Sequence, residues 1–236
     1  MPKTIDISLC PFALAIVFTQ FLGCNTDTSI WTQMSTKSTL MFDGRKYQIS
    51  RARIFAVIPD PYWCDTYNDG ANKGISWFIN FQTADDSDQD RPRNIHFEKL
   101  PIRVRNWCNL TGFSTSWDTA RDPGSGDSRG WIYIDSNILI DEGSVQIVSR
   151  NANTFRVVAS GRNEEGGEFS IDASAQFVGV DVRGSGLDTD DSIRERLRDF
   201  LDDQNLEGTP FKTDRKYDSG VEMGNSVFRP NGYSDL

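Results

Sequence analysis

Apolar and polar residues alternate in short segments through most of the chain between residues 46 and 182. A period of two places successive side chains on opposite faces of a β-strand, so each segment predicts a strand with one buried face. The first run begins at Tyr47 and ends before Pro59, a residue that interior strands exclude. The predicted strands are 47–58, 75–82, 94–100, 102–105, 130–135, 144–150, 154–161 and 168–182.

The spacing of these strands indicates the fold class. Strand segments recur about every ten residues, are rich in β-branched residues, and are separated by turn sequences at 151–153 and 163–167. This pattern is typical of an antiparallel all-β domain. We expect an antiparallel β-sandwich of two sheets, and a lipocalin-like barrel is the alternative.

One helix is expected after the strands, within residues 189–208. Four apolar residues fall at i, i+4, i+7 and i+8, which is one helical face: Ile193, Leu197, Phe200 and Leu201. Asp190 and Asp191 lie near the start, where the helix dipole favours anions, and Ser192 with Glu195 fits a capping box. This amphipathic helix is expected to pack on the sheet.

The N-terminus carries an apolar run, residues 12–18, that is too short to span a bilayer. It is followed by Phe21-Leu22-Gly23-Cys24, which resembles the lipobox of bacterial lipoprotein signal peptides. The resemblance covers residues 1–24 and implies that Cys24 receives a diacylglyceryl group and becomes the first residue of the mature chain. Asn25 in the next position implies sorting to the outer membrane. A secretion signal without lipid, or a buried N-terminal segment, remains an alternative.

The domain boundaries follow from this interpretation. Residues 1–23 are the signal peptide, residues 24–44 are a polar tether, residues 45–208 are the β-domain with its helix, and residues 209–236 are a loosely ordered tail. Removal of the signal leaves Cys64 and Cys108 beside the lipid-bearing Cys24. An oxidising envelope compartment favours a disulfide between these two, worth about 4 kcal/mol by the chain-entropy relation.

The charge of the chain limits its partners. Its formal net charge is −9, which repels phosphate backbones and offers no basic stripe, so nucleic acid is excluded as a partner. The same charge disfavours electrostatic adhesion to anionic lipid, and the membrane is expected to be contacted through the N-terminal lipid instead. The possible partners are therefore a glycan or an envelope protein, and the oligomeric state is left open.

The candidate ligand-binding residues lie in a long segment without periodicity, residues 109–130. Phe113 and Trp117 stand there beside Asp, Asn and Thr, and an exposed indole ring with polar neighbours can stack on a sugar. Packing of Trp117 in the core is the alternative, and it is equally consistent with the sequence. Loops of this length are often functional.

Catalytic and metal-binding motifs are weak. The sequence GDSRG around Ser128 lacks the strand-then-helix context of a hydrolase nucleophile, and the only histidine, His96, alternates with core residues on the expected solvated face. One region spaces acidic residues like the start of a calcium loop but lacks the later ligands, so it is a weak candidate: Asp86, Asp88 and Asp90. We expect no catalytic residue and no cofactor.

The sequence therefore indicates a lipid-anchored envelope protein with a non-catalytic ligand- or partner-binding role. Two other classes remain open. The first is a structural or assembly subunit of an envelope complex. The second is a glycan hydrolase that uses two carboxylates, which 34 acidic residues neither specify nor exclude.

Overall fold

A computed structural model provides the structure of the chain. It describes residues 38–60, 74–84, 94–121, 129–133, 136–185, 189–209, 212–216 and 222–233. The predicted signal peptide with Cys24, the cysteine Cys64 and the weak calcium candidates Asp86, Asp88 and Asp90 all lie outside the described residues. The predictions made for these residues stay predictions.

The described residues form a mainly β structure with one α-helix, as predicted. The elements are β1 (Thr39–Phe42), β2 (Arg45–Ile58), β3 (Ser76–Thr83), β4 (Asn94–Leu100), the short 3₁₀ helix η1 (Trp107–Asn109), β5 (Ser114–Asp118), β6 (Gly130–Tyr133), β7 (Asn137–Asn151), β8 (Thr154–Asn163), β9 (Glu168–Ser185), α2 (Asp190–Phe200), β10 (Leu206–Gly208), β11 (Lys212–Lys216) and β12 (Glu222–Pro230).

All of these strands belong to one sheet. The order β1-β2-β3-β4-β6-β7-β8-β9 returns to its start, because β9 pairs with both β1 and β2. Among the described strands, only the β2–β9 pairing is parallel. Strand β5 pairs with β7, while β12 extends the sheet from the lower half of β9. The pairing thus closes eight strands into a ring.

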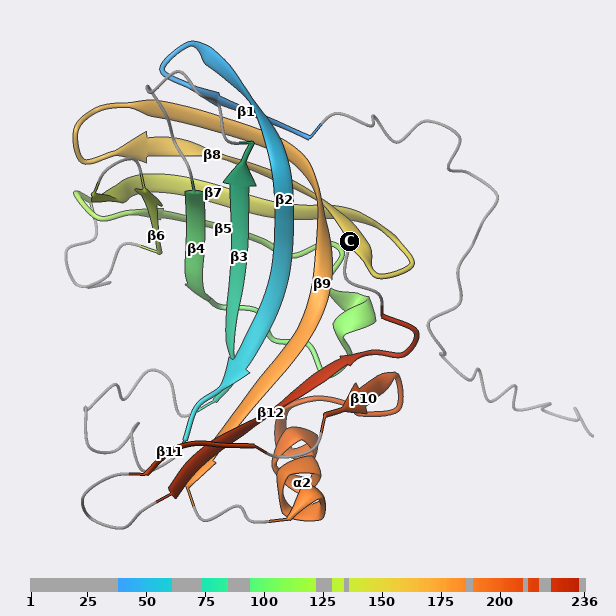
Figure 1. The fold of residues 1–236 in the computed structure, drawn as a ribbon. Coiled ribbons are helices and arrows are strands. Elements are labelled where there is room, and N and C mark those ends of the chain that lie inside the picture. Colours follow the sequence, from blue (N-terminus) through green and yellow to red (C-terminus); the bar gives the residue numbers. More distant parts are fainter. Residues whose placement is uncertain are drawn as a thin grey trace, which may run out of the picture.

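The ring is folded into two facing walls (Figure 1). We call β2, β3, β4 and β6 the first wall, and β7, β8 and the first half of β9 the second wall. The long strands of the two walls run crosswise, and β9 bends from the second wall to lie beside β2. The walls face each other like the layers of the predicted sandwich, while the closed pairing is the feature of the predicted alternative.

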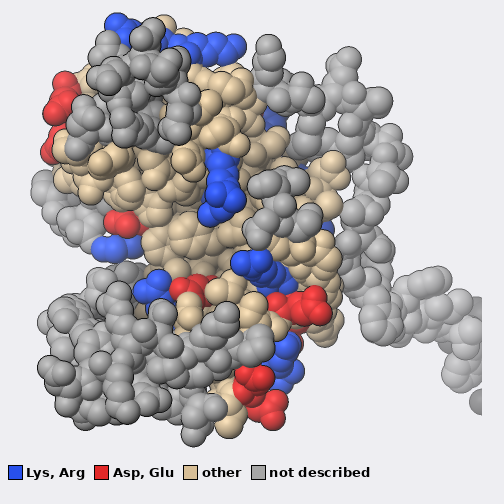
Figure 2. Space-filling model, viewed as in Figure 1, with Lys and Arg blue, Asp and Glu red and all other residues tan. Residues whose placement is uncertain are grey.

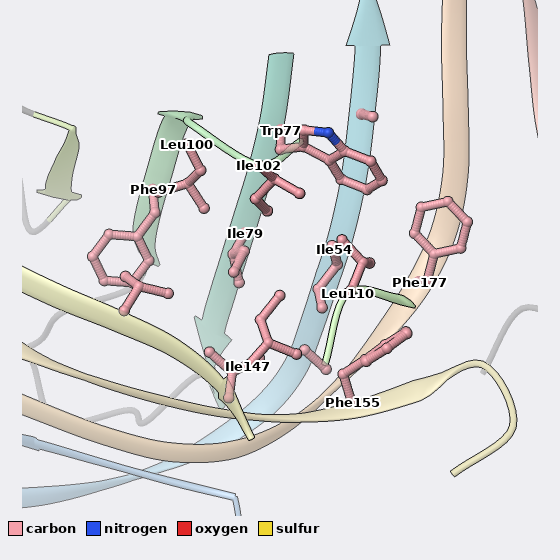
Figure 3. Close-up of a cluster of buried hydrophobic side chains, with 14 of the residues drawn as sticks. Ile54, Trp77, Ile79, Phe97, Leu100, Ile102, Leu110, Ile147, Phe155 and Phe177 are labelled. Atoms are coloured by element: carbon pink, nitrogen blue, oxygen red, sulfur yellow. The ribbon is translucent and has the colours of Figure 1, made fainter. Parts of the chain in front are cut away.

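The core fills the space between the walls (Figure 3). Ile54, Trp77 and Ile79 point inward from the first wall, and Phe155 approaches them from the second wall. Phe177 lies beside Ile54, on the part of β9 that pairs with β2. Each of these side chains is fully buried. Burial of one such side chain stabilises a fold by roughly 1.5–3 kcal/mol, so the alternating positions supply the main driving force for closure.

Helix α2 begins where predicted but ends at Phe200, while the end of the predicted segment forms β10, and the first turn of the helix is capped differently. Thr189 is the N-cap, and its hydroxyl accepts a hydrogen bond from the Ser192 backbone N–H at 3.1 Å. In return, the side chain of Ser192, the third helical residue, accepts from the Thr189 backbone N–H. The predicted capping box, with Ser192 as the cap, is therefore wrong by three residues. The predicted apolar face is confirmed: Ile193, Leu197 and Leu201 are buried.

Two predicted boundaries are wrong. The predicted tether, residues 24–44, includes β1, and the predicted loose tail contributes β12, whose Phe228 is only 2% exposed. The close approach of β12 depends on Gly179, which has φ +134° and where the Cβ of any other residue would collide with the Phe228 carbonyl oxygen. Short strands that add one or two residues to the core leave little periodicity in the sequence, so this tail looked unstructured.

Candidate functional site

Trp117 does not form the predicted exposed platform. It lies in β5, opposite Gly143 of β7, and is 8% exposed. Its indole N–H donates to the Ile140 carbonyl at 3.0 Å, and its ring meets that of Phe97 edge to face, 5.9 Å between centroids. A side chain at Gly143 would collide with this ring. Trp117 is a core residue, and Phe113 beside it is half-buried against the core.

A cluster of rings lies instead on the outer side of the first wall. Phe55 and Phe78 stack nearly parallel at 5.0 Å, and His96 stacks on Trp131 at 4.8 Å. His96 also faces Phe78 at 5.7 Å, so the four rings are continuous. We call Phe55, Phe78, His96 and Trp131 the aromatic cluster. All four are half-buried, and they come from four adjacent strands.

His96 was expected on a solvated face, and this prediction is wrong. Its side chain is only 12% exposed, because the neighbouring rings cover it. Burial lowers its pKa from 6.5 to about 4, so the imidazole is neutral at pH 7. Its Nδ1 lies 3.4 Å from the Asn80 amide nitrogen, and Nε2 lies 3.9 Å from a Glu98 carboxylate oxygen. An amide donor to Nδ1 places the proton of the neutral ring on Nε2.

A pocket of about 460 Å³ lies beside this cluster, where β2 leaves β1. Strand β1 pairs with β9 only as far as Thr39 and Asp172, and β2 joins β9 only from Arg53 and Gln176 onward. A β-bulge between Ile49 and Arg51 widens the gap. The polar side chains that line the pocket are Ser50, Arg51, Arg53, Gln82, Thr154, Ser174, Gln176 and Tyr233. We call it the arginine pocket.

The arginine pocket is rich in donors. None of its described lining residues is acidic. The side chains of Arg51 and Arg53 form no hydrogen bond or ion pair with any residue that the structure describes. Figure 2 shows basic side chains in the middle of this face, within a largely uncharged area of the described surface. Unpaired guanidinium groups beside amides and hydroxyls can hold a polar or anionic ligand.

The site offers no evident catalytic chemistry in its described part. The pocket lining contains no carboxylate, imidazole or thiol, which are the usual acids, bases and nucleophiles. No group of three or more His, Cys, Asp and Glu residues that could hold a metal occurs among the described residues. Within the same ranges, no helix has both the length and the apolar character needed to cross a membrane. Cys108 lies in η1, but Cys64 is outside the described residues, so their disulfide stays a prediction.

The sequence contains part of the signal for this site. The alternation that places Ile54 and Ala56 inside also places Arg53 and Phe55 outside on the same strand. A large aromatic residue on a face expected to be solvated is informative, whereas a cation there is ordinary. The pocket itself depends on the bulge and on the parallel pairing with β9, which local patterns do not reveal.

Comparison with known proteins adds no function. No protein-family model, no curated protein and no solved structure is significantly similar to this chain. The function is therefore inferred from the outer surface of the first wall.

Proposed function

We propose that this protein is a non-catalytic binding module that holds a ligand in the arginine pocket. One observation carries the proposal: Arg51 and Arg53 line a hollow of about 460 Å³ and have no partner within the described residues. Ligand pockets of roughly 300–1,000 Å³ are common in proteins, and a few convergent polar groups fix the orientation of the ligand. We therefore propose the arginine pocket as the ligand-binding site, in place of Trp117 and Phe113, which the sequence had indicated.

The module is proposed to be anchored in the bacterial envelope through lipid on Cys24, facing the periplasm or the cell surface. The sheet begins at Thr39, fifteen positions after that cysteine. A fully extended chain of this length spans about 50 Å, which is enough to hold the domain clear of the headgroups. Two acyl chains provide stable attachment without help from surface charge.

Native mass spectrometry of the full chain, gently extracted from membranes of its own host, tests both parts. We expect a chain that begins at Cys24 with the mass of a diacylglyceryl group, together with retained ligand. Ser174→Trp should fill the pocket and remove the ligand, whereas Ser170→Trp, on the same face of β9 but outside the pocket, should retain it. Equal retention by the two variants, or no retained ligand in the parent protein, would contradict the binding role.

A structural subunit is the second candidate, and exposed apolar residues next to the aromatic cluster favour it. Leu139 lies opposite Trp131 and is 45% exposed, and Tyr133 is 39% exposed. Apolar residues grouped in this way often mark a protein interface. Leu139→Glu should then release a partner that co-purifies in detergent, and a monomer in both forms would exclude this role. No feature of the described surface favours the glycan hydrolase.

A further inference from the structure

We propose that the ligand of the arginine pocket carries a dianionic phosphate group, of the phosphate monoester class, bound between Arg51 and Arg53. This inference rests on the proposed binding function and adds the chemistry of the ligand. It begins from the positions of the two arginines. They are separated by one residue on β2, so their side chains leave the same face of the sheet about 7 Å apart.

The neighbours of the two arginines are donors as well. Arg51 pairs across the sheet with Gln82, and Arg53 pairs with Gln176; both amides line the pocket. The hydroxyl-bearing residues Thr154 and Ser174 complete the opposite side of the pocket. A group held here meets guanidinium, amide and hydroxyl hydrogens from several directions. Such a lining fits a ligand atom group that only accepts hydrogen bonds.

The number of charges selects a dianion. One guanidinium satisfies one carboxylate through two parallel hydrogen bonds, so a carboxylate would leave the second arginine without a partner. A phosphate monoester carries nearly two negative charges at pH 7 and three terminal oxygens, which can accept from both arginine forks. The pocket therefore matches a phosphate monoester better than a monoanion in both charge and oxygen count.

The chain's own charge makes the arrangement selective. With a net charge of −9, the protein repels anions over most of its surface. Two arginines on the second wall are neutralised by acids: Arg156 pairs with Asp172 at 2.7 Å, and Arg162 pairs with Glu142 at 3.0 Å. The arginine pocket differs from these positions in having two cations and no described acid among its lining residues. The attraction of an anion to the pocket is therefore local and opposes the net charge of the molecule.

The rest of the ligand is expected to lie over the aromatic cluster. Phe55 follows Arg53 by two residues on the same face of β2, and its ring stacks on that of Phe78. A phosphate at the arginines therefore places the attached group beside an apolar surface, which suits the C–H face of a sugar ring. The phosphate could belong to a soluble sugar phosphate or to the headgroup of a phosphorylated glycolipid.

Isothermal titration calorimetry on the detergent-solubilised full chain tests the inference. The probes are glucose 6-phosphate and glucose, followed by vesicles with and without a monophosphorylated glycolipid. We expect glucose 6-phosphate or the phosphorylated vesicles to bind, and glucose and plain vesicles to bind at least tenfold more weakly. Binding of the free sugar phosphate indicates a soluble ligand, and binding of the phosphorylated vesicles alone indicates a headgroup.

Three variants identify the contact. The double variant Arg51→Gln/Arg53→Gln should weaken phosphate binding at least about tenfold without unfolding the protein, because neither side chain has a described partner. Arg51→Lys/Arg53→Lys should restore part of the affinity, since it keeps the charges but loses the planar forks. Arg156→Gln, on the second wall, should leave phosphate binding unchanged.

The outcomes separate this inference from the proposed function. If the native ligand is displaced by Ser174→Trp but contains no phosphate, or if glucose binds as tightly as its phosphate, the pocket binds a ligand and the phosphate inference is wrong. If no phosphate probe binds, the inference is also wrong. If the Ser174→Trp and Ser170→Trp variants retain the same ligand, both the pocket and its proposed chemistry fail.

Discussion

The two walls of the ring are alike inside and different outside. On the second wall, outward polar residues satisfy each other: Glu142 pairs directly with Arg162, and the Ser144 and Ser160 hydroxyls lie 3.2 Å apart. On the first wall, outward positions carry the stacked rings of the aromatic cluster and Arg53, which has no partner among the described residues. Both walls are built from the same alternation, and only the chemistry of the outward residues distinguishes them.

This difference supports the proposal that a ligand or partner protein binds on the outer face of the first wall. Cross-strand pairs of opposite charge stabilise a sheet modestly and leave a surface that is complete without a ligand. Half-buried rings on an outer face leave apolar surface exposed to water, and a cation without a partner gains no ion-pair stabilisation in the isolated protein. Their presence on the described part of the first wall is easier to explain by binding than by folding, and the predictions below test this division.

The largest expected effect concerns a tryptophan inside the ring. Trp117→Ala removes a buried indole that packs on Gly143 and donates to Ile140, so the free energy of unfolding should fall by about 3–5 kcal/mol. Urea denaturation measures this loss. Binding to the arginine pocket, measured where the variant is still folded, should be unchanged. Loss of binding with unchanged stability would mean that Trp117 contacts the ligand and is not a core residue.

The second effect depends on pH and belongs to the first wall. Burial among rings lowers the pKa of His96 to about 4, against 6.5 in the unfolded chain. The unfolded state therefore binds the extra proton first, and stability falls as the pH drops from 6.5 towards 4, by about 3 kcal/mol in total. Glu98 at 3.9 Å is the described acid nearest to the ring.

The difference in the free energy of unfolding between the parent protein and His96→Phe isolates the contribution of His96, because carboxylates that titrate in the same range affect both proteins equally. Denaturant unfolding at pH 7.5, 6, 5 and 4.5 should show the parent losing stability relative to His96→Phe as the pH falls. If the parent and His96→Phe lose stability in parallel, His96 is not buried as described.

The sequence predicted the inside of this molecule better than its outside. The positions of β2, β3, β4, β8 and β9 followed from alternation, because a strand with one buried face must repeat every two residues. β1, β5 and β12 were missed, because each buries few side chains. β5 shows the reason: it buries Trp117 between polar neighbours, so its sequence looked like a loop.

The candidate site was predicted poorly for a physical reason. The polar neighbours in sequence suggested exposure for His96 and left the burial of Trp117 open. Burial was decided instead by neighbours in space, on β3, β6 and β7. The arginine pocket joins residues from β2 with residues from β8 and β9, more than one hundred positions later in the chain. No local pattern encodes such a meeting.

The third effect is a change in the pKa of His96 caused by replacing the ring beside it, without loss of the fold. Trp131→Ala removes the ring that stacks on His96 and opens the imidazole to water. Because burial is what lowers the pKa of His96, the pKa of the variant should rise towards 6.5. An NMR titration of the single histidine measures it directly. The stacking itself is worth about 1 kcal/mol, so the variant should remain folded. An unchanged pKa would mean that other groups bury His96.

The smallest effect tests the second wall. Arg156 donates two hydrogen bonds to Asp172, at 2.9 and 2.7 Å, and the bond from Arg156 lowers the pKa of the carboxyl group. Both side chains are about half exposed, so a double-mutant cycle with Arg156→Gln and Asp172→Asn should give a coupling of about 0.2–1 kcal/mol. The coupling is lost on acidification, when Asp172 becomes protonated.

Arg53→Gln is the matched variant on the first wall. It removes a cation that has no described partner, so the free energy of unfolding should change by less than about 0.5 kcal/mol. If Arg53→Gln instead costs as much stability as Arg156→Gln, then Arg53 is already satisfied within the protein. In that case the cations of both walls have partners within the protein. The binding role requires instead that Arg53 has no partner until the ligand binds.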